Sequence, residues 1–205
     1  MKNFINVGKT EEEQAEQIKK WIRENGMQII AGVVIGLTAI WGLDYYKNYQ
    51  YEQSIQARSS YLSVVSNSNN VQALTALQNN HADSGYTQQA VLMMAKHAVD
   101  AQNYQQALDY LSPLISSDNQ FIAHTAKLRS ASIHLEMGNH DQALSVLGSN
   151  ESSEFSSLYD HTKGDIYLSL NNIDSAKKHY QLALGQLSAD SELKNLIQIK
   201  LNDLN

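Results

Sequence analysis

The chain has 205 residues and a formal net charge of −6 at pH 7, and its length suits one domain of about 160 residues beside a short separate segment. It contains no cysteine, which excludes thiolate catalysis, cysteine-ligated metal sites and disulfide bonds. Its acidic balance argues against a nucleic-acid-binding protein, because that function requires clustered basic charge.

The N-terminal segment, residues 1–26, carries the first helix signal. Thr10 followed by Glu13 forms a capping-box pattern, in which the two side chains satisfy backbone N–H groups at the start of a helix. Ile18 and Trp21 then share one helical face. This pattern predicts either a short juxtamembrane helix on the inner leaflet or a helix that continues into the next segment.

The next segment, residues 27–43, contains no ionisable side chain. A helix of this length is roughly 25 Å long, slightly short of a ~30 Å hydrocarbon core. Aromatic residues on both sides, such as Trp21 and Tyr45, are typical of membrane interfaces. We therefore predict a transmembrane helix. The alternative, a buried helix of a soluble core, is disfavoured because no other part of the chain is apolar enough to surround it.

Basic side chains near this helix are concentrated on its N-terminal side. Those before it are Lys9, Lys19, Lys20 and Arg23, whereas the nearest ones behind it are Lys47 and Arg58. The positive-inside rule therefore predicts that residues 1–26 are cytoplasmic and that residues 44–205 lie across the membrane. A cleaved signal peptide is the alternative. It is disfavoured because no small-x-small cleavage site follows the apolar run.

Within the predicted span, Gly32 and Gly36 form a GxxxG pair. Small residues at this spacing let a second transmembrane helix approach closely, so they are candidate contacts with another membrane protein. Glycine is also common in transmembrane helices that make no such contact. The motif therefore leaves both a specific helix contact and a simple tether open.

After the span, the pattern is helical and repeats. The tripeptide Gln-Ala-Leu recurs with its alanine at Ala73, Ala107 and Ala143, and a weaker copy is centred on Ala176, so that the spacings are 34, 36 and 33 residues. An asparagine precedes each alanine by four residues, and we interpret it as the left-handed residue of a tight interhelical turn. These spacings predict stacked helix–turn–helix units in which the alanine lies where two helices cross.

A second small residue is expected twelve positions before each alanine, on the first helix of the unit. Ala95, Ala131 and Gly164 meet this expectation, whereas Tyr61 in the first unit does not. The pattern resembles the tetratricopeptide repeat (TPR) over roughly residues 57–183, with a degenerate first repeat. We expect a loop at 149–157 and a C-terminal capping helix with four residues turned inward, Leu193, Leu196, Ile197 and Leu201. The predicted fold class is all-α, a single N-terminal transmembrane helix followed by a TPR-like α-solenoid with a capping helix.

The whole chain is similar to the ancillary SecYEG translocon subunit family, also called the YfgM-like family. The residues that carry the resemblance are 21–26 before the span, Gly32, Gly36 and Gly42 within it, Tyr45, Tyr46 and Gln50 after it, and 198–204 at the end. The resemblance implies an inner-membrane protein with a periplasmic TPR domain. It also implies association with the SecYEG translocon and with the periplasmic chaperone PpiD, in order to assist newly exported polypeptides.

Sequence motifs for chemistry are missing. None of the seven histidines has HExxH or another metal-ligand spacing, and there is no GxSxG motif or phosphate-binding glycine loop. Asp160 and His161 are adjacent in a predicted helix and so point in different directions, which disfavours a catalytic pair with a nearby serine. We predict no enzymatic activity, no metal and no cofactor.

Binding is the better-supported role, because the first helix of each TPR unit lines a concave groove. The repeat register places these candidate groove residues there: Leu92, Lys96, Val99, Leu128, Leu135 and Leu168, together with Ser132, His161 and Asp165. The apolar members suit an amphipathic or unfolded segment of a partner. Lys96 is the one cation, so an acidic C-terminal peptide is disfavoured. The alternative is that the protein buries these leucines itself, for example under its C-terminal helix.

The sequence therefore favours a non-enzymatic TPR protein anchored in the inner membrane that acts as a docking surface at the export channel. One alternative is a scaffold for another cell-envelope assembly or secretion machine, and a second is an enzyme or ligand-binding domain on a TPR-like frame. Self-association through the span or the solenoid stays open.

Overall fold

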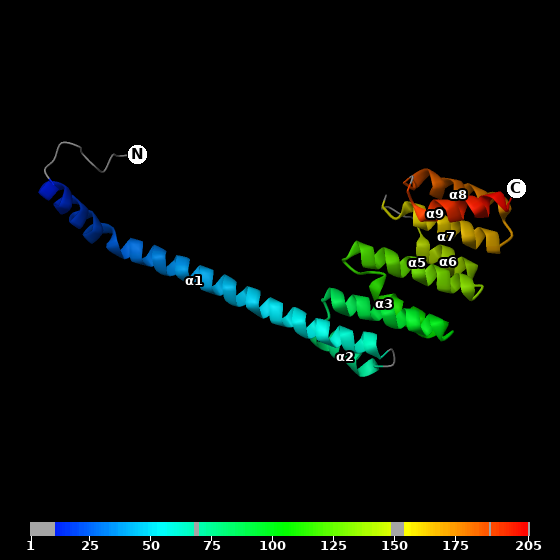
Figure 1. The fold of residues 1–205 in the computed structure, drawn as a ribbon, viewed down its shortest axis with the longest axis horizontal. Coiled ribbons are helices and arrows are strands. Elements are labelled where there is room, and N and C mark those ends of the chain that lie inside the picture. The colour runs from blue at the N-terminus through cyan, green and yellow to red at the C-terminus, as the bar shows by residue number, and fades with distance from the viewer. Residues whose placement is uncertain (1–10, 68–69, 149–153, 189, 205) are drawn as a thin grey trace. The chain divides into compact units, whose positions relative to one another are not determined.

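A computed structural model describes residues 11–67, 70–148, 154–188 and 190–204 of the chain. Over these residues the fold is all-α and contains no strand (Figure 1). The described helices are α1 (Glu11–Ser66), α2 (Val71–Asn80), α3 (Gly85–Asp100), α4 (Tyr104–Leu111), the 3-10 helix η1 (Ser112–Leu114), α5 (Gln120–Glu136), α6 (His140–Leu147), α7 (Ser156–Ser169), α8 (Ile173–Gln186) and α9 (Glu192–Asn202). The chain divides into two compact units, Met1–Ile55 and Gln56–Asn205.

The described part of the first unit is a single helical stretch, because α1 runs without a break from Glu11. Of the two alternatives for the N-terminal segment, the structure therefore has the helix that continues into the span. Thr10, the expected capping residue, lies outside the described residues. Of the described helices, α1 is the one that is long and apolar enough to cross a membrane.

No residue of 11–55 is buried in the structure. Ile35 is 69 % exposed and Trp41 is 83 % exposed, so this apolar surface has no cover within the described chain. The Thr38 hydroxyl donates to the Val34 carbonyl at 2.7 Å, which satisfies this polar group inside the helix.

The second unit is a stack of helix pairs, α3 with α4, α5 with α6 and α7 with α8 (Figure 1). The last turns of α1 and the short α2 precede them, and Ala57 and Val64 of α1 share one core cluster with Leu74 and Leu77 of α2. In this first repeat Ala73 is only half-buried, and Leu74 is buried in its place. The first repeat is thus degenerate, as its sequence predicts.

In the other three pairs, both small-residue positions of the repeat lie in the core. Ala107, Ala143 and Ala176 are 0 % exposed. On the facing first helices, Ala95 and Ala131 are buried as well. Gly164 of α7 is the extreme case, because a Cβ added there would lie 2.5 Å from the Cδ1 and Cε1 atoms of the Tyr180 ring in α8. The spacing of small residues therefore sets how closely the two helices of a pair approach each other.

The turns within the pairs correct one sequence interpretation. The left-handed residue is the one before each repeat asparagine: Gln102 (φ 59°), Gly138 (φ 74°) and Asn171 (φ 57°). The asparagines themselves have negative φ angles and occupy the N-cap position of the second helix. For example, the Asn103 N–H donates to the Ala98 carbonyl at 2.8 Å and the Gln102 N–H to the Val99 carbonyl at 2.8 Å. This pattern is a Schellman motif, which places the left-handed conformation one residue earlier than we predicted.

The C-terminal helix α9 closes the stack, as expected, but with one difference. Ile197 and Leu201 are buried against Ala176, Tyr180 and Ala183 of α8. Leu196, which we expected to face inward, is 45 % exposed. Buried positions four residues apart leave Leu196 rotated by about 100° from Ile197 and outside the contact.

The serine-rich segment 149–157 is partly described. Residues 149–153 lie outside the described residues, as does Asn69 of the first repeat. Glu154 and Phe155 form a turn, and α7 begins at Ser156. The last two residues of the predicted loop, Ser156 and Ser157, are therefore the first two residues of α7.

Candidate functional site

The predicted groove residues lie on α3, α5 and α7, the first helices of their pairs. On α3, Leu92 is buried, Val99 is half-buried and Lys96 is exposed. On α5 and α7, Leu128, Leu135 and Leu168 are half-buried.

The leucines of this set contact the protein's own core. Leu92 belongs to the core cluster that runs from the end of α1 to α5. Leu128 and Leu135 pack on the cluster around Ala131 and Tyr159. Leu168 packs on the cluster that contains Ile197 and Leu201 of α9. In the last repeat, the C-terminal helix thus covers part of the predicted groove face.

A polar network reinforces this cover. The Lys200 ammonium of α9 donates to the Asp165 carboxylate at 2.6 Å and to His161 Nε2 at 3.2 Å. The Tyr180 hydroxyl donates to the same carboxylate at 2.5 Å. Burial lowers the pKa of His161, and the Lys200 charge lowers it further, although Asp165 opposes both. His161 and Asp165, which we expected to face the groove, are therefore bound by Lys200 of α9.

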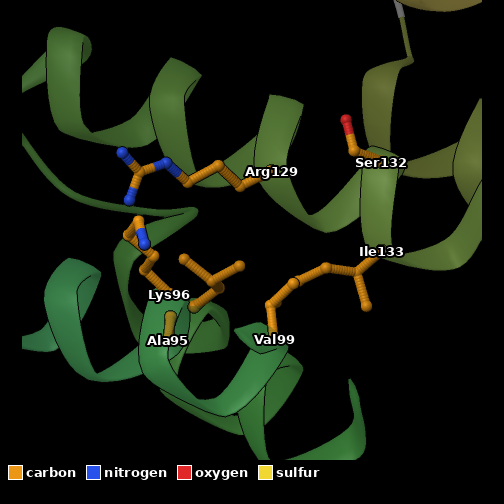
Figure 2. A pocket seen from close by; sticks show the side chains of 7 residues that line it. Ala95, Lys96, Val99, Arg129, Ser132 and Ile133 are labelled. Atoms are coloured by element: carbon orange, nitrogen blue, oxygen red, sulfur yellow. The ribbon is translucent and has the colours of Figure 1, made fainter. Parts of the chain in front are cut away.

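A pocket remains between α3 and α5 (Figure 2). It has a volume of about 310 Å³ and is lined by Ala95, Lys96, Val99, Leu111, Arg129, Ser132 and Ile133. Of the predicted groove residues, the pocket brings together Lys96, Val99 and Ser132. The four leucines do not line it.

The pocket also contains a cation that the sequence reasoning missed. Arg129 lies on α5 three residues before Ser132, so the two side chains share one helical face. The signal was present, because Ser132 is in the expected groove register and a residue three positions earlier belongs to the same face. Figure 2 shows the Arg129 guanidinium and the Lys96 ammonium on the same side of the pocket.

Both cations have partners within the chain. Lys96 forms an ion pair with Asp100 at 2.7 Å, one turn along α3, with both side chains more than half exposed. The hydrogen bond from Lys96 lowers the pKa of the Asp100 carboxyl. Arg129 Nη1 of α5 donates to the Leu92 carbonyl of α3 at 3.2 Å, between two neighbouring helix pairs.

The predicted transmembrane contact, Gly32 and Gly36, lies on the exposed surface of α1. A Cβ added at either glycine would meet no described atom within 4 Å. A helix contact at these glycines therefore needs a second protein and stays a prediction.

Three of the other histidines, His124, His140 and His179, make interhelical hydrogen bonds. His179 Nδ1 lies 2.9 Å from the Asp160 carboxylate, and His124 Nδ1 lies 2.8 Å from the Tyr159 hydroxyl. Asp160 thus faces α8, whereas the adjacent His161 faces Asp165 and Lys200. Among the described residues, no group of three or more His, Asp or Glu side chains is placed to hold a metal ion.

Comparison with known proteins finds relatives whose sequences align with nearly the whole chain. A sequence profile described as a tetratricopeptide repeat-like domain matches residues 19–205. A protein of Aggregatibacter actinomycetemcomitans named ancillary SecYEG translocon subunit is 30 % identical and aligns over 95 % of this chain and 97 % of its own length. Proteins of the same name from Haemophilus influenzae and Escherichia coli are 28 % and 22 % identical; the alignments cover 95 % and 98 % of this chain, and 97 % and 99 % of those proteins.

Proposed function

This chain belongs to the ancillary SecYEG translocon subunit family and carries its tetratricopeptide repeat-like domain, and from that premise we propose a non-enzymatic protein of the inner membrane that acts at the SecYEG translocon. In this proposal residues 27–43 cross the membrane once, residues 1–26 are cytoplasmic and residues 44–205 form the periplasmic TPR-like domain. The domain binds translocating polypeptides and the periplasmic chaperone PpiD.

The exposed apolar surface of α1 is the observation that carries the membrane assignment. Exposing apolar surface to water costs about 25 cal/mol per Å², and none of the most apolar 18-residue window of α1 is buried. Lipid removes this cost. An uninterrupted helix is also the backbone conformation that a hydrocarbon core permits, because its N–H and C=O groups bond to one another.

The distribution of basic residues supports the orientation. Lys19, Lys20 and Arg23 lie within about two turns of the apolar segment on its N-terminal side. Such cations hold their end of the helix in the cytoplasm. The TPR-like domain is then on the periplasmic side, where exported chains emerge.

The TPR-like domain supplies the binding surface. Its first helices present the α3–α5 pocket, and a single anchor holds that pocket in the same membrane as its partners. Tethering raises the effective concentration of one partner at the other, so a weak groove contact suffices for function. No described constellation of side chains supplies a nucleophile, base and orienting group together, which supports a binding role over an enzymatic one.

Photo-crosslinking of the full chain in living cells tests the proposal. A crosslinker at Ser132, which is exposed and lines the pocket, is expected to capture PpiD and polypeptides in transit, and mild detergent extraction is expected to recover SecYEG subunits. A crosslinker at Lys178, exposed on α8 and outside the pocket, is the matched control. Recovery of a different envelope machine in place of SecYEG would contradict the proposal and favour the scaffold alternative.

A further inference from the structure

We propose that the α3–α5 pocket binds an internal polypeptide segment that presents a carboxylate side chain beside aliphatic ones. This inference rests on the proposed function and deepens it, because it gives the chemistry of the partner. The occupant is an amphipathic segment with two aliphatic residues four positions apart and a Glu or Asp immediately before the second.

The floor of the pocket is apolar. Ala95, Leu111 and Ile133 are buried beneath it and Val99 is half-buried at its side. Covering this surface favours an aliphatic side chain, because burial of apolar area is the main source of binding free energy. A volume of about 310 Å³ is at the small end of ligand pockets, which suits side chains of a peptide better than a large cofactor.

The edge of the pocket is positively charged. Lys96 and Arg129 line it, and none of the described residues that line it is acidic. This contrasts with the rest of the domain, since residues 44–205 contain sixteen Asp and Glu against ten Lys and Arg. A carboxylate between the two cations forms charge-assisted hydrogen bonds.

The present partners of the two cations leave room for such a ligand. The Lys96–Asp100 pair lies at the exposed surface, where ion pairs are weak and readily exchanged. Arg129 uses one N–H for the Leu92 carbonyl, and a guanidinium has five N–H donors. That hydrogen bond to the main chain fixes the guanidinium beside the pocket instead of blocking it.

The protein's own C-terminal helix offers a template for such a segment. In the last repeat, α9 buries Ile197 and Leu201, four residues apart, against α8 and places Lys200, immediately before Leu201, on Asp165 of α7. The α3–α5 pocket combines an apolar floor with the opposite charge. The matching occupant therefore carries an acidic residue where α9 carries Lys200.

An internal segment fits better than a chain terminus. The lining residues lie within helices α3, α4 and α5, where backbone N–H groups are used in helical hydrogen bonds. Capture of a terminal carboxylate commonly uses a nest of free backbone N–H groups, and the helix faces that line this pocket provide none. A side-chain carboxylate needs only the two cations.

The test measures peptide binding to the full chain in lipid nanodiscs. The probe is a fluorescent amphipathic peptide, acetylated and amidated at its ends, with leucines four apart and Glu before the second leucine. The comparison peptides replace Glu with Gln or Lys, and a further Gln peptide has a free C-terminal carboxylate. The Glu peptide is expected to bind about tenfold more tightly than the capped Gln peptide.

Variants of the protein assign this preference to the pocket. K96Q and R129Q are each expected to weaken binding of the Glu peptide about tenfold, whereas K178Q, outside the pocket, leaves it unchanged. R129E is expected to shift the preference toward the Lys peptide, a gain that misfolding cannot produce.

Two results would overturn the inference: equal binding of the capped Glu and Gln peptides, or binding of the free-carboxylate peptide alone. If SecYEG still co-purifies with the wild-type chain in either case, the proposed function stands and only the peptide chemistry is wrong. Loss of SecYEG from the wild-type preparation would refute the proposed function itself.

Discussion

Replacing Gly164 by alanine tests the claim that the small-residue spacing sets the approach of paired helices. The added Cβ would lie 2.5 Å from two ring carbons of Tyr180 and 3.1 Å from a third. Tyr180 is fully buried and its hydroxyl is bonded to Asp165 at 2.5 Å, so the ring has no free direction in which to move.

The magnitude follows from two opposing effects. Alanine is favoured over glycine inside a helix by about 1 kcal/mol. Overpacking a core costs about 1–3 kcal/mol, and weakening the buried hydrogen bond between Tyr180 and Asp165 adds about 1–3 kcal/mol. We expect G164A to lower the free energy of unfolding by about 2 kcal/mol.

Urea denaturation of the full chain in detergent, followed by circular dichroism, measures this change. The matched control is G185A in α8, where an added Cβ meets no described atom within 4 Å; this variant is expected to be as stable as the wild type or slightly more stable. If G164A behaved like G185A, the close approach of α7 and α8 at Tyr180 would be refuted.

Three further predictions concern the polar network on α9, the half-buried His161 and the span. K200A removes one of the partners of Asp165 and is expected to cost about 1–2 kcal/mol of stability, with faster hydrogen exchange in α9 and unchanged exchange in α3; uniform exchange would contradict it. Burial lowers the pKa of His161 in the folded protein below its ordinary value of 6.5. The stability that the neutral His161 side chain contributes is therefore complete above pH 6.5, and it is lost as the pH falls from 6.5 toward the lower pKa of the folded state. H161Q should therefore show a smaller fall in urea midpoint than the wild type between about pH 7 and about pH 5, and an equal fall would show that His161 is not responsible. Replacing Gly32 and Gly36 with leucine is expected to leave the helical content unchanged but to reduce co-purification of SecYEG; undiminished co-purification would mean that the span is only a tether.

The sequence predicted the solenoid because its spacing reflects a steric requirement. Ala107, Ala143 and Ala176 are fully buried between the two helices of a pair, where a larger side chain would overpack the contact, so the requirement is visible in the sequence as a pattern of small residues. The same spacing predicts a small residue at Gly164, which packs against the Tyr180 ring.

Other features depend on details that a pattern does not contain. The asparagine of each turn follows the left-handed residue instead of being it, since a Schellman motif fixes the left-handed position by hydrogen bonding and accepts Gln102 there as well as Gly138. Leu196 has the same hydropathy as Leu193 but lies one position off the buried stripe.

The site was predicted only in part for a related reason. Repeat register predicts which helix faces form the groove, and three residues of that prediction, Lys96, Val99 and Ser132, line the α3–α5 pocket. That a partner binds there stays a prediction. The register did not reveal that α9 would occupy His161 and Asp165, because such a contact joins residues far apart in sequence through a charge pair. Repeat register did not predict Arg129 because its position, three residues before Ser132, lies beside the predicted line of groove residues on the same face of α5.

Labelling of single cysteines tests the central claim most directly, because the natural chain contains none and background labelling is therefore absent. Glu12 and Lys178 lie before and after the predicted span, and both are exposed, so E12C and K178C each introduce one accessible thiol into the full chain. With a membrane-impermeant maleimide applied to intact spheroplasts, we expect K178C to be labelled and E12C to be labelled only after lysis. Labelling of E12C in intact spheroplasts, with K178C protected until lysis, would contradict a periplasmic TPR-like domain that one transmembrane helix anchors with its N-terminus in the cytoplasm.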